Sequence, residues 1–172
     1  RGRLPIAYHC GGLRSPPRRI VTTNNQAGAT GSTGSLATAL AHAERLLAKS
    51  PGLAAEQVNE ILAVFPGHPS ALLLLATARN RLGDAAAAHT ILEPLAAAHA
   101  DRAVVHYELG LAHGALRHGE RAVQALRRAV ELQPELGEAW RALGDHLHAL
   151  GENKAAGDAY PRHLAFSTRV PP

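Results

Sequence analysis

A single offset of 34 residues aligns most of this 172-residue chain with itself. At one phase of that period stand Ala54, Ala88, Ala122 and Ala156. Four residues further on stand Val58, Leu92, Leu126 and Tyr160. One short unit cannot bury its own apolar face, so copies of it must stack on their neighbours to form a core. The period therefore predicts a solenoid of stacked units.

Each unit divides into two amphipathic segments with a turn near its middle. Four units are expected, at about 35–68, 69–102, 103–136 and 137–170. Their central turns are marked by Ser50-Pro51-Gly52, Gly83-Asp84, Arg117-His118-Gly119 and Gly151-Glu152. Alanine at the repeated position lets two helices approach within about 8–10 Å. The pattern predicts an all-α fold, an α-solenoid of about four helix-turn-helix repeats.

The composition agrees with helices and disfavours a β fold. Hydrophobic residues make up 46% of the chain but aromatic residues only 3%, whereas strands use aromatic and β-branched side chains. The formal charge of +4 is carried by the first 35 residues, which hold five arginines and no acid, whereas the rest has 13 basic and 14 acidic residues. Residues 1–35, rich in Gly, Ser, Thr and Pro, are expected to be a disordered basic leader, and 36–168 the helical array.

Several classes of function lack their sequence signatures. Cys10 is the single cysteine, so no internal disulfide can form, and none of the 11 histidines lies in a zinc-binding pattern. No nucleophile elbow or phosphate-binding loop occurs, so we expect no catalytic residue, no metal and no cofactor. Without a run of roughly 18 apolar residues or a signal peptide, we expect a cytoplasmic protein that does not enter a membrane. Nucleic acid is disfavoured as a partner, because no cluster of aromatic residues or lysines accompanies the arginines of the leader.

Two stretches carry a resemblance to a known family. Trp140-x2-Leu143-Gly144 followed by Ala156-x3-Tyr160 in the fourth unit, and Leu109-Gly110 with Ala122, Leu126 and Pro134 in the third, resemble the tetratricopeptide repeat. The resemblance covers about four-fifths of the chain and implies a right-handed solenoid that binds a protein or peptide. The run 71–134 is also similar to the repeat region preceding a sulfotransferase domain in some bacterial proteins.

In this family, the first helix of each unit lines a concave groove that receives peptides. Carried over by repeat position, the resemblance implies a groove lined by Leu73, Thr77, Asn80, Arg81, Tyr107, Leu111, Arg141, Asp145 and His148. Tyr107 would be a stacking anchor, with Arg141 and Asp145 as polar selectors. Leu73 and Tyr107 stand where polar or basic residues would be needed to clamp a peptide carboxylate, so no such clamp is expected.

The leading hypothesis is a non-catalytic protein-protein interaction scaffold. The alternative is an N-terminal regulatory or substrate-presenting arm of a bacterial sulfotransferase-like enzyme whose catalytic domain is absent from this chain. The partner, the biological process and the oligomeric state are left open. Two departures from the repeat have local consequences: Arg117 occupies the usual turn glycine of the third unit, and Gly157 with Pro161 is expected to kink or fray the last helix.

Overall fold

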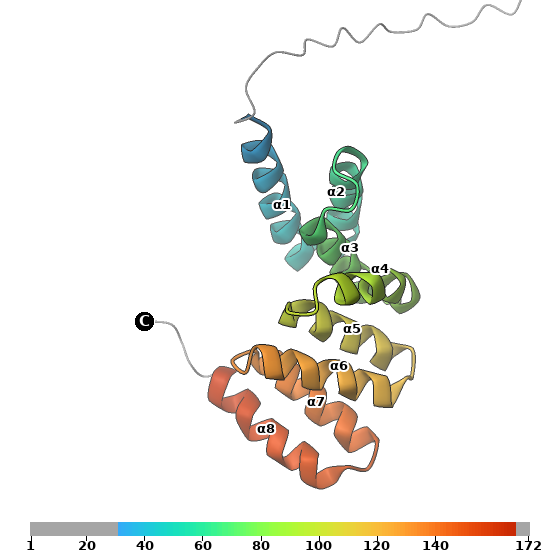
Figure 1. The fold of residues 1–172 in the computed structure, drawn as a ribbon, viewed down its shortest axis with the longest axis vertical. Coiled ribbons are helices and arrows are strands. Elements are labelled where there is room, and N and C mark those ends of the chain that lie inside the picture. Colours follow the sequence, from blue (N-terminus) through green and yellow to red (C-terminus); the bar gives the residue numbers. More distant parts are fainter. Residues whose placement is uncertain (1–30, 168–172) are drawn as a thin grey trace, which may run out of the picture.

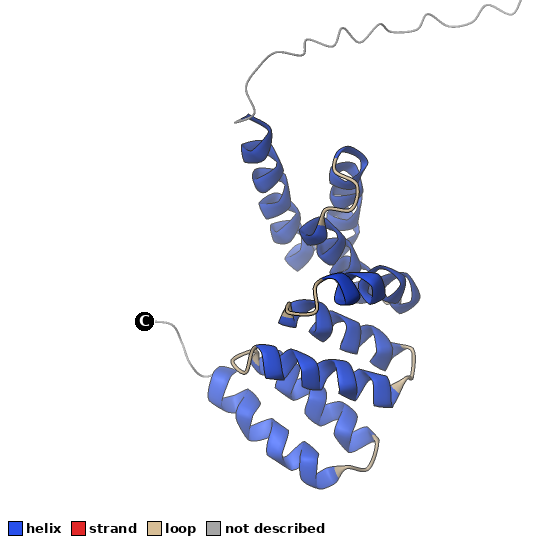
Figure 2. Cartoon of the chain, viewed as in Figure 1, coloured by secondary structure: helices blue, strands red, loops and turns tan. Residues whose placement is uncertain are grey.

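The computed structural model describes residues 31–167, and every regular element in that range is a helix (Figures 1 and 2). The eight helices of this range are α1 (Gly31–Lys49), α2 (Pro51–Val64), α3 (Pro69–Arg81), α4 (Ala85–Ala98), α5 (Ala103–Ala115), α6 (Gly119–Leu132), α7 (Gly137–Ala149) and α8 (Asn153–Ser167). Short turns join them. The all-α prediction is confirmed, with two helices in each predicted unit.

The helices stack in chain order from α1 and α2 at one end to α7 and α8 at the other (Figure 1). Each helix contacts the next one, and α1, α3, α5 and α7 also contact one another in sequence. Within the described residues, α2, α4, α6 and α8 make no equivalent contacts among themselves. The odd-numbered helices therefore lie closer together, on the inner side of the array. This arrangement is the predicted α-solenoid.

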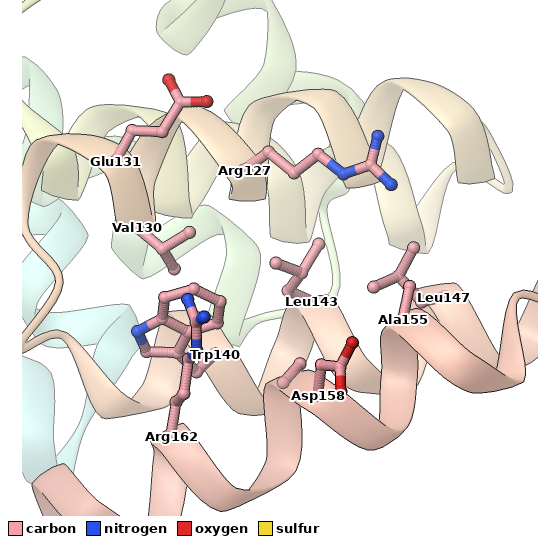
Figure 3. Close-up of a pocket in the computed structure, with 10 residues that line it drawn as sticks. Arg127, Val130, Glu131, Trp140, Leu143, Leu147, Ala155, Asp158 and Arg162 are labelled. Carbon is pink, nitrogen blue, oxygen red and sulfur yellow. The ribbon is translucent and has the colours of Figure 1, made fainter.

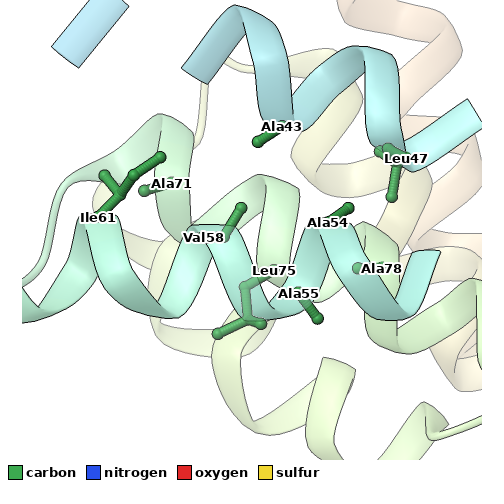
Figure 4. Close-up of a cluster of buried hydrophobic side chains, with 9 residues drawn as sticks. All are labelled: Ala43, Leu47, Ala54, Ala55, Val58, Ile61, Ala71, Leu75 and Ala78. Carbon is green, nitrogen blue, oxygen red and sulfur yellow. The ribbon is translucent and has the colours of Figure 1, made fainter. Parts of the chain in front are cut away.

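The core follows the repeat rather than a single centre. Ala54, Ala88, Ala122 and Ala156 are all buried. Three clusters of buried apolar side chains each join three consecutive helices: α1 to α3 (Figure 4), α3 to α5, and α6 to α8. The largest fully buried side chains are Leu92, Leu126, Val58 and Val105. Stability is therefore distributed along the stack, as expected for a chain whose units contact only their neighbours.

The turns inside units 2, 3 and 4 share one geometry. Gly83 and Gly151 have φ near +81°, and Arg117, at the same repeat position, has φ of +64°. In each case the following amide closes the helix, as His118 N does on the carbonyl oxygen of His113 at 2.9 Å. Within residues 31–167, Arg117 is the one residue other than glycine that has a positive φ. The prediction that it takes the place of a turn glycine is confirmed.

Of the two outcomes expected at Pro161, a kink or fraying, fraying is not observed, because α8 continues through this residue to Ser167. Tertiary contacts hold the turn that follows. The guanidinium of Arg162 lies 4.6 Å from the ring centroid of Trp140, and His163 Nδ1 lies 2.9 Å from the carbonyl oxygen of Gly137. Similarly, α4 continues through Pro94 because Leu92 and its neighbours are buried against α3 and α5.

The start of α1 bears on the predicted boundary between the leader and the helical array. Helix α1 begins at Gly31, inside the segment for which the composition predicts disorder, and residues 1–30 of that leader lie outside the described residues. The division at residue 35 stays a prediction.

None of the helices found between residues 31 and 167 combines the length and apolar character that crossing a bilayer requires.

Candidate functional site

The inner face of the array contains a cavity of about 200 Å³ between α3 and α5. It is lined by Asn80, Arg81, Tyr107, Glu108, Leu111 and Ala115. Four of these six residues were predicted for the groove from repeat position alone. We call these six residues the inner pocket.

Glu108 is a buried carboxyl group of this pocket, with 6% of its surface exposed. Asn80 Nδ2 donates hydrogen bonds to Glu108 Oε2 at 2.8 Å and to the Glu108 carbonyl oxygen at 3.0 Å. Burial raises the pKa of Glu108, while hydrogen bonds from Asn80 and Thr77 and the charge of Arg81 act in the opposite direction. The carboxyl group thus joins α3 to α5 and gives the pocket a polar interior.

Arg81 lies at the exposed edge of the pocket and also connects two units. Its Nη1 donates a hydrogen bond to the carbonyl oxygen of Leu47 at 2.8 Å, across the boundary between units 1 and 2. In a continuous helix that oxygen would accept from the amide four residues later, but this residue is Pro51, which has no N–H. The guanidinium therefore supplies a donor that the local sequence cannot provide.

Tyr107 and Leu111 form the apolar side of the pocket. Both are half-buried and pack against the cluster of α6 to α8. Burial raises the pKa of Tyr107, with further contributions from Glu108 and Glu138, while Arg141 and Arg81 lower it. The phenol therefore lies among charged groups of α3, α5 and α7. Such a ring offers apolar contact area together with one polar atom.

On α7, Arg141 and Asp145 are half-exposed and already bound to each other. Arg141 Nη1 lies 3.5 Å from Asp145 Oδ2, and Arg141 Nη2 lies 3.2 Å from Glu138 Oε2. Tyr160 donates its hydroxyl hydrogen to Asp145 Oδ1 at 3.1 Å. These contacts fix the two predicted selectors in position, with part of their surface open to solvent.

The structure separates the other predicted residues from the inner pocket. Thr77 is only 8% exposed and its side chain hydrogen-bonds to the carboxyl group of Glu108, so it offers a partner little surface, and its place in the groove stays a prediction. Leu73 is half-buried and packs against the cluster of α3 to α5. His148, on α7, is exposed, and its Nδ1 lies 2.8 Å from Asn153 Oδ1.

Two pocket residues, Glu108 and Ala115, were not predicted from the sequence. For Glu108 the sequence did contain a signal. Leu74 and Ala142 occupy the same repeat position, so a glutamate there is a charged residue at an apolar position of the repeat. Such a substitution points to a buried polar contact with a neighbouring unit. Ala115 has no comparable signal.

A second hollow of about 280 Å³ lies between α6 and α8, with one side of α7 forming its floor (Figure 3). Its floor is apolar and includes Leu143 and Leu147, and its rim carries the charged residues Arg127, Glu131, Asp158 and Arg162. Arg127 is paired with Glu152 and Arg162 stacks on Trp140, so both basic groups are engaged internally. In the part of the chain that is described, no group of three or more His, Cys, Asp or Glu side chains could hold a metal ion.

Comparisons with known proteins agree with this architecture. Residues 107–170 match the family model of the tetratricopeptide repeat. No curated protein gives a match. Among solved structures, MamA from Desulfovibrio magneticus RS-1 (residues 41 to the end) is 21% identical with a TM-score of 0.67, over 83% of this chain and 82% of that one. Another crystal structure of MamA is 18% identical with a TM-score of 0.65, over 80% and 81%. At these identities the likeness shows the fold.

Proposed function

We propose that this chain is a non-catalytic scaffold that binds a segment of a partner protein in the groove formed by α3, α5 and α7. The observation that carries the proposal is the inner pocket, a hollow with an apolar side and a polar interior on the inner face of a solenoid. The repeat match over residues 107–170 includes Tyr107 of α5 and the whole of α7, and it supports a protein-binding role for these two helices of the groove.

Binding would depend on a few anchoring contacts. A partner side chain entering the pocket would lie against Tyr107 and Leu111 and lose its water there, which is how interface hot spots are usually built. Arg81 at the edge, and the pair of Arg141 and Asp145 on α7, would select polar groups of the same segment. Because these side chains already hold one another in place, little ordering is needed on binding.

The test starts from peptides selected on the immobilised full chain from a display library. Their affinities are then measured by fluorescence polarisation for the wild type, Tyr107→Ala and Arg141→Glu. Removing the anchor is expected to weaken binding by about tenfold or more, since truncating a hot spot costs about 2 kcal/mol or more and about 1.4 kcal/mol corresponds to tenfold.

The matched control is Arg128→Ala on α6, whose side chain pairs with Glu131 away from the inner pocket. It should leave affinity unchanged, and circular dichroism should show that all variants keep their helical content. Peptides that bind Tyr107→Ala and Arg141→Glu as tightly as the wild type would refute a groove at this place.

The remaining expectations stay predictions. The matched family and the similar structures name no sulfotransferase, so the alternative of an enzyme's regulatory arm has no observation in its favour. The cytoplasmic location also remains a prediction from the sequence.

A further inference from the structure

Three histidines from different elements meet at the junction of units 2 and 3. They are His89 on α4, His113 on α5 and His118 just before α6. The ring centroids of His89 and His113 lie 4.8 Å apart at an interplanar angle of 63°, and those of His113 and His118 lie 5.8 Å apart at 54°. This histidine cluster lies outside the inner pocket.

The inner part of the cluster is buried and poor in hydrogen bonds. His113 has 6% of its surface exposed. His89 Nε2 and His113 Nδ1 are buried and make no hydrogen bond to any described residue. Glu93 Oε2, on α4, lies 3.6 Å from His89 Nε2. A neutral His113 ring fits such a place, because a charged imidazole with a buried Nδ1–H would lack an acceptor there.

The charges around His113 oppose its protonation. On α4 it faces His89 and Glu93, and at the start of α6 it faces His118 and Arg121. On α7, His146 lies against Gly114, the next residue of α5, while α3 meets α5 at Glu108. Burial lowers the pKa of His113, and His89, His118 and Arg121 lower it further, against the single raising effect of Glu93.

The repeat itself provides the comparison. At the next junction, between units 3 and 4, the positions of His89 and His113 are occupied by Val123 and Leu147. Both are buried in the cluster of α6 to α8. The same backbone site therefore accepts an apolar pair at one junction and a histidine pair at the other.

We propose that the histidine cluster makes the junction between units 2 and 3 acid-sensitive. Neutral rings pack α4, α5 and the start of α6 together, and protonation of the buried His113 places a charge beside His89, His118 and Arg121 where water has little access, so this junction loosens before the rest of the array. The inference rests on the fold alone and does not depend on the proposed binding function.

The direction of the effect follows from linkage. The pKa of His113 is lower in the folded chain than its ordinary value of 6.5, so below that pH the unfolded chain binds more protons than the folded one. The contribution of neutral His113 to the free energy of unfolding is therefore complete above about pH 6.5. It is lost as the pH decreases from there through the folded-state pKa. A loosened α5 would also carry Tyr107 and Glu108 away from α3.

The decisive experiment compares thermal unfolding of the full chain at about pH 7.5 and about pH 5.5, a range in which histidines change charge. The test variant is His89→Val with His113→Leu, which copies the residues of the next junction. We expect the wild type to lose about 4 °C or more of Tm on acidification, and the variant to lose clearly less. An equal loss in both proteins would overturn the proposal.

Two further measurements complete the test. His42→Ala replaces an exposed histidine by its repeat counterpart Ala76 and should keep the pH dependence of the wild type. If the double variant does not fold, hydrogen exchange of the wild type decides, corrected for the effect of pH on intrinsic rates. Faster exchange at low pH in α4 and α5 than in α7 and α8 supports the proposal, and a uniform change or none refutes it.

Discussion

Asn80 on α3 donates two hydrogen bonds from its Nδ2 to Glu108 on α5, one to the carboxylate and one to the backbone oxygen, at 2.8 and 3.0 Å. The two residues are 28 positions apart and belong to different units. The contact links the two helices that form the inner pocket. It also makes one buried carboxyl group responsible for both the packing of a junction and the polarity of the groove.

Removing this carboxyl group should be costly, whereas neutralising it should not. Glu108→Ala leaves the hydroxyl of Thr77 and one of the two N–H groups of the Asn80 amide without their acceptor, which should lower the free energy of unfolding by about 1–3 kcal/mol. Glu108→Gln keeps an acceptor oxygen and should remain close to the wild type in urea denaturation at neutral pH. Equal losses in the two variants would contradict this role of Glu108.

The same pair predicts a pH dependence. Because burial raises the pKa of Glu108 in the folded state above its ordinary 4.5, the folded chain binds its proton more readily than the unfolded chain. As the pH falls from the folded-state pKa toward about 4.5, the wild type should therefore gain stability relative to Glu108→Gln. A constant difference between the two curves would show that the carboxyl group is not desolvated.

Gly144 and Gly157 should respond oppositely to alanine. A Cβ at Gly144 would lie 2.7 Å from Tyr160 Cε1, and the ring is held by its bond to Asp145, so Gly144→Ala should destabilise the chain by about 1–3 kcal/mol. A Cβ at Gly157 meets nothing within 4 Å, so Gly157→Ala should stabilise α8 by about 0.5–1 kcal/mol. Chemical denaturation measures both, and a shared sign would exclude this account of the α7–α8 contact.

Arg117→Gly should stabilise the chain. Arg117 holds φ of +64°, which costs a side-chain-bearing residue about 1–2 kcal/mol but not glycine. After allowing for the greater freedom of glycine in the unfolded chain, we expect a gain of about 0.5–1 kcal/mol in thermal unfolding. Gly83→Arg, the reverse change at the same repeat position, serves as the control and should destabilise. No gain on Arg117→Gly would mean that the arginine side chain makes a compensating contact.

Arg81→Ala should loosen the end of α1. The guanidinium supplies the donor that Pro51 cannot give to the carbonyl oxygen of Leu47. Hydrogen exchange should therefore rise in the last turn of α1, where the Ser50 amide is bonded to the Leu46 oxygen. Arg79→Ala, on the same helix and paired with Asp84, is the control and should leave that turn protected. Unchanged exchange in Arg81→Ala would show that this bond does not hold the two units together.

Some features of the groove followed from the repeat, and others did not. The sequence brought Asn80, Arg81, Tyr107 and Leu111 to one inner face by their positions in the repeat, and one cavity joins them. It did not reveal that Thr77 is covered, because that depends on where the Glu108 side chain turns. Nor did it reveal the histidine cluster, whose members come from three elements.

By itself, the sequence determined the helices, the turns between them and the alanine positions at which they cross, because these depend on backbone geometry and on side chains within about one helical turn. Only the tertiary structure decided how polar side chains pair across units and how α8 continues past Pro161. Those outcomes depend on the distance and rotation between stacked helices. They are set by the packing of all neighbouring side chains together, and no short segment encodes them.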